Sequence, residues 1–241
     1  MYGLWWDPMY LVFTLPALLL TLVAQAWVKS AYRKGLNVPN RQRVTGMQGA
    51  DALLNRAGLY LGVEVIGGEL SDHYDPRSNK LRLSQGVASS ASVGALAIVA
   101  HEIGHAMQDE EDYAPLRVRS ALVAPVNIGT RLGYALFFIG FTLNYLTGLG
   151  SIGRFISWVG ILGFCLAVLF ALVTLPVEFN ASRRGLTLLT ESGLVVEEQM
   201  GYARNVLTAA SLTYVAALAQ ALAQVMYLVF RLTAGRSRRR R

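Results

Sequence analysis

Four long apolar stretches constrain this chain of 241 residues more than any other feature. The first, residues 9–28, is twenty residues long without a charge, and as a helix it would span about 30 Å, the thickness of a bilayer's hydrocarbon core. The others cover about residues 132–149, 155–177 and 206–230. Charged residues make up 15% of the sequence, against about 25% in soluble domains. This composition excludes a disordered chain and argues against a wholly soluble globule.

The first stretch is predicted to be an uncleaved membrane span. No Lys or Arg precedes it, whereas Lys29, Arg33 and Lys34 follow it. A secretory signal peptide has the opposite order of charge. The second and third stretches are joined by the glycine-rich turn at residues 148–154, so we expect them to form a transmembrane hairpin.

The basic residues predict the orientation in the membrane. Eleven Lys and Arg lie between Lys29 and Arg119, and the hairpin turn adds only Arg154. The positive-inside rule therefore places the segments around the hairpin in the cytoplasm and the N-terminus outside. The Arg-rich C-terminal tail conflicts with this rule if all four stretches span, so the sequence leaves open whether the fourth stretch crosses or is re-entrant. The expected organisation is an N-terminal span (1–28), a cytoplasmic segment (29–120), the hairpin (121–177), a second cytoplasmic segment (178–205), a spanning or re-entrant helix (206–230) and a tail (231–241).

The first cytoplasmic segment contains the signals for a small α+β part. Thr45 is a predicted N-cap for a helix over residues 46–59, because apolar residues follow at helical spacing. Short strands are expected within residues 60–68 and 79–86, with a turn between them. A second helix should begin near residue 90. The strand around Leu81 is expected to offer its edge to an extended peptide.

The second of these helices contains the sequence His101-Glu102-Ile103-Gly104-His105. Residues four apart share one helix face, so both imidazoles can bind one zinc ion with Glu102 beside the vacant coordination position. Zinc lowers the pKa of a bound water to about 7, and the Glu carboxylate can take its proton as the water attacks an amide. A chain of this composition has the pattern by chance on the order of once in a thousand.

A third ligand must come from elsewhere in the chain. Metzincins have a glycine and a histidine where this chain has Gln108 and Glu111, so that class is excluded. His73 is the only other histidine, but a histidine in a turn is more often structural.

Glu178, directly after the third apolar stretch, is the better candidate. It lies on the same membrane face as the HEIGH helix if the hairpin crosses twice, and an unpaired carboxylate there would be costly. The alternative is an ion pair with Arg183 or Arg184.

Three segments resemble the YugP-like neutral zinc metallopeptidases of bacterial membranes: HEIGHAMQ, SDHYDPRSNKLRLS and LPVEFNASRRG. The resemblance extends over nearly the whole chain, and more distantly the layout is similar to HtpX-type gluzincins with a cytoplasmic zinc site. It implies one zinc ion per chain held by His101, His105 and Glu178, with Glu102 as the general base. It also implies a multi-pass protein of the bacterial inner membrane.

Two positions depart from the family pattern. Gluzincins commonly have an aspartate where this chain has Ser182, and the YugP-like pattern usually has one where this chain has Asn180. Both side chains can hydrogen-bond an imidazole without adding charge, so zinc affinity or activity is expected to be lower. His73 and Tyr74 are candidates for donors to the oxyanion, or for hydrogen bonds that only support the turn.

The sequence therefore predicts a mainly α integral membrane protein with three to four transmembrane helices and a small α+β zincin-like cytoplasmic catalytic part. The expected activity is zinc-dependent endoproteolysis of membrane-associated or misfolded proteins, with the lipid bilayer and a protein or peptide as partners and no role in nucleic-acid binding. Two alternatives stay open: a non-proteolytic zinc-dependent membrane scaffold or binding protein, and an intramembrane site-2-type protease. The second is disfavoured because acidic residues follow the HEIGH motif directly.

Overall fold

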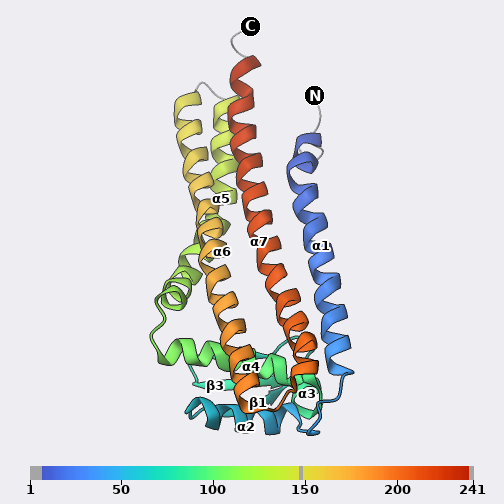
Figure 1. The fold of residues 1–241 in the computed structure, drawn as a ribbon. Coiled ribbons are helices and arrows are strands. Elements are labelled where there is room, and N and C mark those ends of the chain that lie inside the picture. The colour runs from blue at the N-terminus through green and yellow to red at the C-terminus, as the bar shows by residue number, and fades with distance from the viewer. Residues whose placement is uncertain (1–6, 147–148, 239–241) are drawn as a thin grey trace. The chain divides into compact units, whose positions relative to one another are not determined.

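The computed structural model describes residues 7–146 and 149–238, which are mainly helical with one small sheet (Figure 1). In chain order the elements are α1 (Pro8–Leu36), α2 (Gly46–Ala57), β1 (Gly62–Ile66), β2 (His73–Asp75), β3 (Lys80–Ser84), α3 (Gln85–Ser89), α4 (Val93–Glu110), α5 (Ala114–Leu146), α6 (Gly150–Ser192) and α7 (Glu197–Arg238).

The chain forms two compact units. The first, here called the helical unit, comprises Met1–Val23, Val118–Thr174 and Tyr214–Arg241. The second, here called the site unit, comprises Ala24–Arg117 and Leu175–Thr213. Each unit has its own hydrophobic core, so each is described by itself.

Four helices are long and apolar enough to cross a membrane: Pro8–Leu36, Ala114–Tyr145, Gly150–Ser192 and Glu197–Ala234. By length and composition the fourth apolar stretch is therefore as acceptable a span as the other three. The predicted turn at residues 148–154 is wrong for residues 150–154, which already belong to α6; residues 147–148 lie outside the described chain. Every one of these helices also extends beyond its predicted apolar core.

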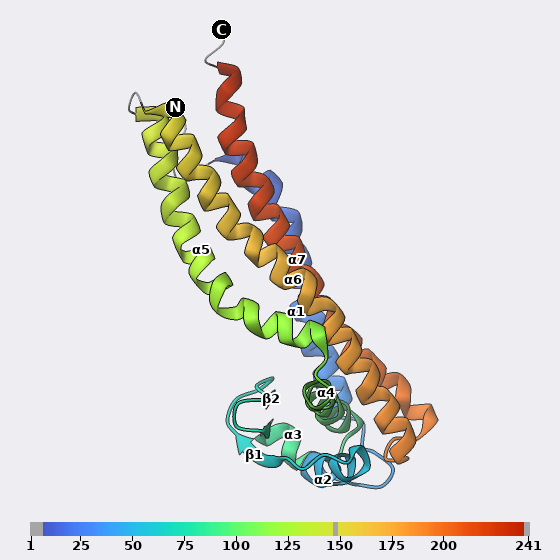
Figure 2. The same cartoon turned by 90° about the vertical axis from the view of Figure 1, so that its left-hand side faces the viewer.

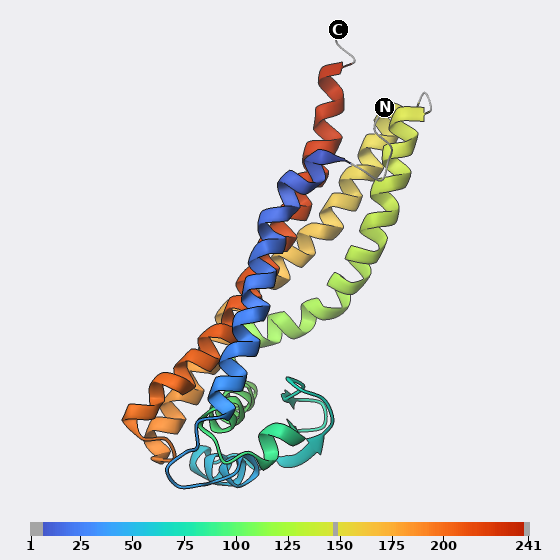
Figure 3. The same cartoon turned by 90° about the vertical axis from the view of Figure 1, so that its right-hand side faces the viewer.

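Small residues let α5 and α6 approach closely within the helical unit. A Cβ atom on Gly133 would lie 2.9 Å from the carbonyl oxygen of Gly160, and one on Gly140 would lie 2.4 Å from that of Gly153. Membrane helices commonly pack through such small residues. In the same unit α1 runs beside α7 (Figures 1 and 3), where Asp7 forms an ion pair with Arg231.

The site unit contains a three-stranded sheet in the order β1-β3-β2 (Figure 2). Strand β3 pairs in parallel with β1 and antiparallel with β2. Both edges of β3 are thus occupied, and the expectation that the strand around Leu81 offers a free edge is wrong. The short strand β2 forms within the predicted turn, and as an edge strand it leaves one side unpaired among the described strands.

Helices α2 and α4 begin close to where the sequence signals place them, whereas α3 was not predicted and begins within the strand expected at residues 79–86. Thr45 caps α2 in a complete capping box with Gln48, and Ser92 caps α4 by accepting a hydrogen bond from the backbone N–H of Ala95. Leu96 and Ile103 of α4 are fully buried in the core of the unit. Their burial fixes the rotation of α4 and therefore the face on which the HEIGH histidines lie.

Helices α4 and α6 cross in very close contact through two glycines. A Cβ atom on Gly104 would lie 2.4 Å from the carbonyl oxygen of Ala181, and one on Gly185 would lie 2.7 Å from that of Ala100. Real Cβ atoms do not approach a backbone oxygen this closely, so the helices could not keep this separation with larger residues. The crossing brings the end of the third apolar stretch against the HEIGH helix.

We predict that Gly104→Ala destabilises the site unit, because the added methyl group must push α6 away from α4. Overpacking of this kind costs about 1–3 kcal/mol. Thermal unfolding in detergent micelles should show a lowered midpoint for Gly104→Ala and for Gly185→Ala. The matched control is Gly201→Ala in α7, where a Cβ meets nothing within 4 Å, and which should leave the midpoint unchanged or raise it. Equal midpoints for all three variants would contradict the close crossing.

Candidate metal site

Helix α4 presents the two histidines of the HEIGH motif on one face. Their ring centroids are 4.8 Å apart and the rings are nearly perpendicular, with an interplanar angle of 81°. Side chains one turn apart are neighbours on a helix surface, so the spacing in the sequence produces this pairing directly. Both side chains are largely shielded from solvent, with 13% of His101 and 12% of His105 exposed.

Helix α6 adds Glu178, which is 2% exposed, to the two histidines. Its Oε2 atom lies 3.4 Å from Nε2 of His101 and 3.5 Å from Nε2 of His105. One donor atom from each of the three residues falls within 4.8 Å of the others. The alternative for Glu178 was an ion pair with Arg183 or Arg184. Arg184 pairs with Glu111 instead.

This donor set fits zinc. A tetrahedral zinc with bonds of about 2.0–2.1 Å separates neighbouring ligand atoms by about 3.3–3.4 Å. The two carboxylate–imidazole distances are close to that value. Two imidazole nitrogens and one carboxylate oxygen are also a common three-residue ligand set of catalytic zinc sites, which keep the fourth position open.

Glu102 lies beside the cluster and is held by β2. The backbone N–H of Tyr74 donates to Oε2 of Glu102 over 3.0 Å. Burial raises the pKa of the Glu102 carboxyl, although the nearby histidines and this hydrogen bond oppose the rise. Burial alone would lower the pKa of His105, but its hydrogen bond with the Glu178 carboxylate raises it above the ordinary value.

The structure places Ser182 and Asn180 differently. Oγ of Ser182 lies 3.1 Å from Nδ1 of His101, so Ser182 contacts a histidine of the cluster directly. Asn180 contacts neither histidine; its Oδ1 accepts from Gln108 at 2.9 Å and from Arg184 at 2.7 Å.

Sequence reasoning missed Gln108. This side chain is fully buried, and its Oε1 lies 3.0 Å from Nδ1 of His105. The signal was present, because Gln108 lies three residues after His105 and so shares its helix face.

The two candidates from the turn do not join the cluster through their side chains. His73 is exposed, and its Nδ1 atom lies 2.7 Å from the carbonyl oxygen of Ser71. The hydroxyl oxygen of Tyr74 lies 2.9 Å from Oδ2 of Asp109 and 3.1 Å from Oδ1 of Asn79. Of the two residues, only the backbone N–H of Tyr74 reaches the motif, at Glu102.

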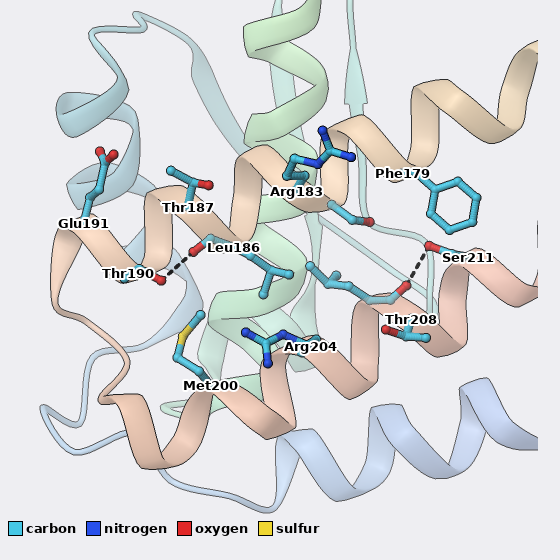
Figure 4. Close-up of a pocket in the computed structure, with 12 residues that line it drawn as sticks. Phe179, Arg183, Leu186, Thr187, Thr190, Glu191, Met200, Arg204, Thr208 and Ser211 are labelled. Atoms are coloured by element: carbon cyan, nitrogen blue, oxygen red, sulfur yellow. Dashed lines mark hydrogen bonds between the residues drawn. The ribbon is translucent and has the colours of Figure 1, made fainter.

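A cavity of about 700 Å³ lies between α6 and α7 in the site unit (Figure 4). Phe179 and Arg183 of α6 and Arg204 and Thr208 of α7 are among the residues that line it. Ser182 also lines this cavity, whereas Glu102 and the two motif histidines do not. None of the three candidate ligands lines the cavity, which reaches the cluster only at Ser182, the hydrogen-bond partner of His101.

Comparison with known proteins assigns the chain to a family. Residues 10–233 match the family model described as "Putative neutral zinc metallopeptidase". The chain is also 36% identical over 229 residues to the "Putative membrane protease YugP" of Bacillus subtilis (strain 168), covering 95% of this chain and 98% of that protein. No solved structure matches the chain significantly. The chain belongs to the neutral zinc metallopeptidase family.

Proposed function

We propose that this protein is an integral-membrane zinc metalloendopeptidase that hydrolyses peptide bonds in membrane-associated or misfolded proteins. The observation that supports this proposal is the convergence of His101, His105 and Glu178 beside Glu102. The two histidines and Glu178 come from segments far apart in the sequence, and both carboxylate–imidazole distances are close to those of a tetrahedral zinc site. The similarity to a membrane protease supports the proposed class of substrate.

Bound zinc would act as a Lewis acid and lower the pKa of a water molecule to about 7. Glu102 would accept the proton of that water as it attacks the peptide carbonyl, and then donate it to the leaving nitrogen. The N–H of Tyr74 holds Oε2 of this carboxylate in place.

The proposed site faces the cytoplasm of a bacterial cell. The site unit includes Ala24–Arg117, and nearly all of the eleven basic residues that precede the hairpin belong to this segment. The positive-inside rule places such a segment on the cytoplasmic side of the inner membrane. The same distribution predicts that the N-terminus lies outside.

The metal site predicts about one zinc ion per chain in the purified protein, and a sharp loss of zinc in His101→Ala and in Glu178→Ala. Each variant removes one of three ligands, which leaves too few for stable binding. Elemental analysis of detergent-purified protein measures this directly. The control is His73→Ala, which removes the exposed histidine outside the cluster and should retain zinc. Full zinc content in Glu178→Ala would rule out the third ligand.

Glu102→Gln should abolish peptide hydrolysis and keep zinc, because the amide cannot accept the proton of the attacking water. Loss of a general base typically costs about 10²–10⁴-fold in rate. Hydrolysis of an unfolded protein substrate and zinc content should be measured on the same preparation. The matched control is Glu69→Gln, the same chemical change at an exposed position. Unchanged hydrolysis by Glu102→Gln would refute the proposed mechanism, and a wild type with zinc but no hydrolysis of any protein would favour the scaffold.

The orientation can be tested with one introduced thiol. Cys165 is the only cysteine of the chain, so Cys165→Ser gives a background without thiols. Tyr60 is 91% exposed in the site unit, and Tyr60→Cys in that background should react with a membrane-permeant maleimide in intact spheroplasts. A membrane-impermeant maleimide should label it only after lysis. Labelling by the impermeant reagent before lysis would place the site unit outside the cytoplasm.

A further inference from the structure

Gln108 links the candidate metal site to the backbone of α6 through several hydrogen bonds. Only one assignment of donors and acceptors satisfies all of them. Its Nε2 atom donates to the carbonyl oxygen of Val177 over 2.8 Å and to Oδ1 of Asn180 over 2.9 Å. Its Oε1 atom lies 3.0 Å from Nδ1 of His105. The side chain is fully buried, so water cannot replace any of these partners without cost.

The carbonyl of Val177 determines which way the amide of Gln108 points. A backbone carbonyl oxygen can only accept hydrogen bonds, so the amide nitrogen of Gln108 must face it. The amide oxygen must then face His105. Because an amide oxygen also only accepts, Nδ1 of His105 must carry a proton.

Asn180 and Arg184 fix the same direction a second time. A guanidinium only donates, so Asn180 must turn Oδ1 toward Nε of Arg184, which lies 2.7 Å away. That oxygen then accepts from Gln108 as well. Arg184 is itself held by two hydrogen bonds to the carboxylate of Glu111, at 2.6 and 2.7 Å. The neutral Asn180 thus meets two donors at one oxygen.

We infer that Gln108 is a positioning residue that holds His105 in the tautomer protonated at Nδ1 and so leaves the lone pair of Nε2 free for zinc. This inference rests on the proposed function, because it assigns a role toward the proposed metal. A metal-bound histidine commonly donates its other ring N–H to a carboxylate or carbonyl. In this chain a neutral amide takes the place of that carboxylate, and its direction is set before any metal binds.

His101 provides an internal comparison. Its Nδ1 atom faces the hydroxyl of Ser182, which can rotate and can either donate or accept. A hydroxyl therefore supports either tautomer, whereas the amide of Gln108 supports one. The tautomer of His105, but not that of His101, should depend on Gln108.

The test uses full-length protein with ¹⁵N-labelled histidine rings. The chain has three histidines, so few ring signals need to be assigned. In metal-free wild type at mildly alkaline pH, we expect His105 to be protonated at Nδ1. Gln108→Met removes the acceptor with little change in volume and should shift His105 toward the form protonated at Nε2, which a free imidazole side chain favours. Zinc affinity, measured by competition with a chelator, should fall by about 10–100-fold.

The matched control is Gln199→Met, which makes the same chemical change in the site unit. Gln199 donates to the carbonyl oxygen of Pro39, a residue outside the candidate metal site. This variant should keep both the His105 tautomer and the zinc affinity. Arg184→Met should also keep the tautomer, because Val177 still directs the amide of Gln108.

A metal-free wild-type His105 that is protonated at Nε2 and not at Nδ1 would overturn the inference. Unchanged zinc affinity and tautomer in folded Gln108→Met would overturn it too. Failure of this inference can be distinguished from failure of the proposed function. If the wild type shows no peptide hydrolysis or binds no zinc, the tautomer of His105 can still be measured on the metal-free protein.

Discussion

The close crossing of α4 and α6 is the constraint on which the candidate site depends. Histidines one turn apart give two ligands, and two ligands do not make a zinc site. The third comes from α6, and its carboxylate lies within 3.4–3.5 Å of the imidazoles because Gly104 and Gly185 place no Cβ atom between the helices. Gly104 lies inside the HEIGH motif itself. The same short segment therefore contributes two candidate ligands and leaves space for α6, which contributes the third. Burial of Ile103 on the opposite face fixes the rotation of α4.

The groups that contact Nδ1 of the two motif histidines are polar and uncharged. Ser182 contacts His101, and Gln108 contacts His105. Carboxylates that orient metal ligands raise their basicity, and neutral groups orient them without that effect. The sequence suggested weaker support of the histidines, because positions 180 and 182 are not aspartates. In the structure, the amide of Gln108 orients His105 instead.

The sequence allowed most local elements to be predicted, because their signals act over a few residues. Thr45 and Ser92 cap their helices, the two longer strands form where valine or leucine alternates with polar residues, and the HEIGH histidines share one helix face. The strand β2 was missed because its pairing with β3 is a tertiary contact across a turn rich in polar residues. The edge expected at β3 was wrong for the same reason, since strand order cannot be read from strand signals.

The sequence by itself determined the class of molecule: its apolar stretches, its basic segments and its HEIGH motif depend on composition and on helical spacing alone. Only the tertiary structure decided which distant side chains meet. Glu178 was a candidate from the sequence, but its alternative, an ion pair with Arg184, was removed by the position of Glu111. Gln108 gained its role in the same way, because its partners Val177 and Asn180 lie about seventy residues away along the chain. Periodicity is a property of one segment, whereas the direction of a hydrogen bond depends on every group that surrounds it.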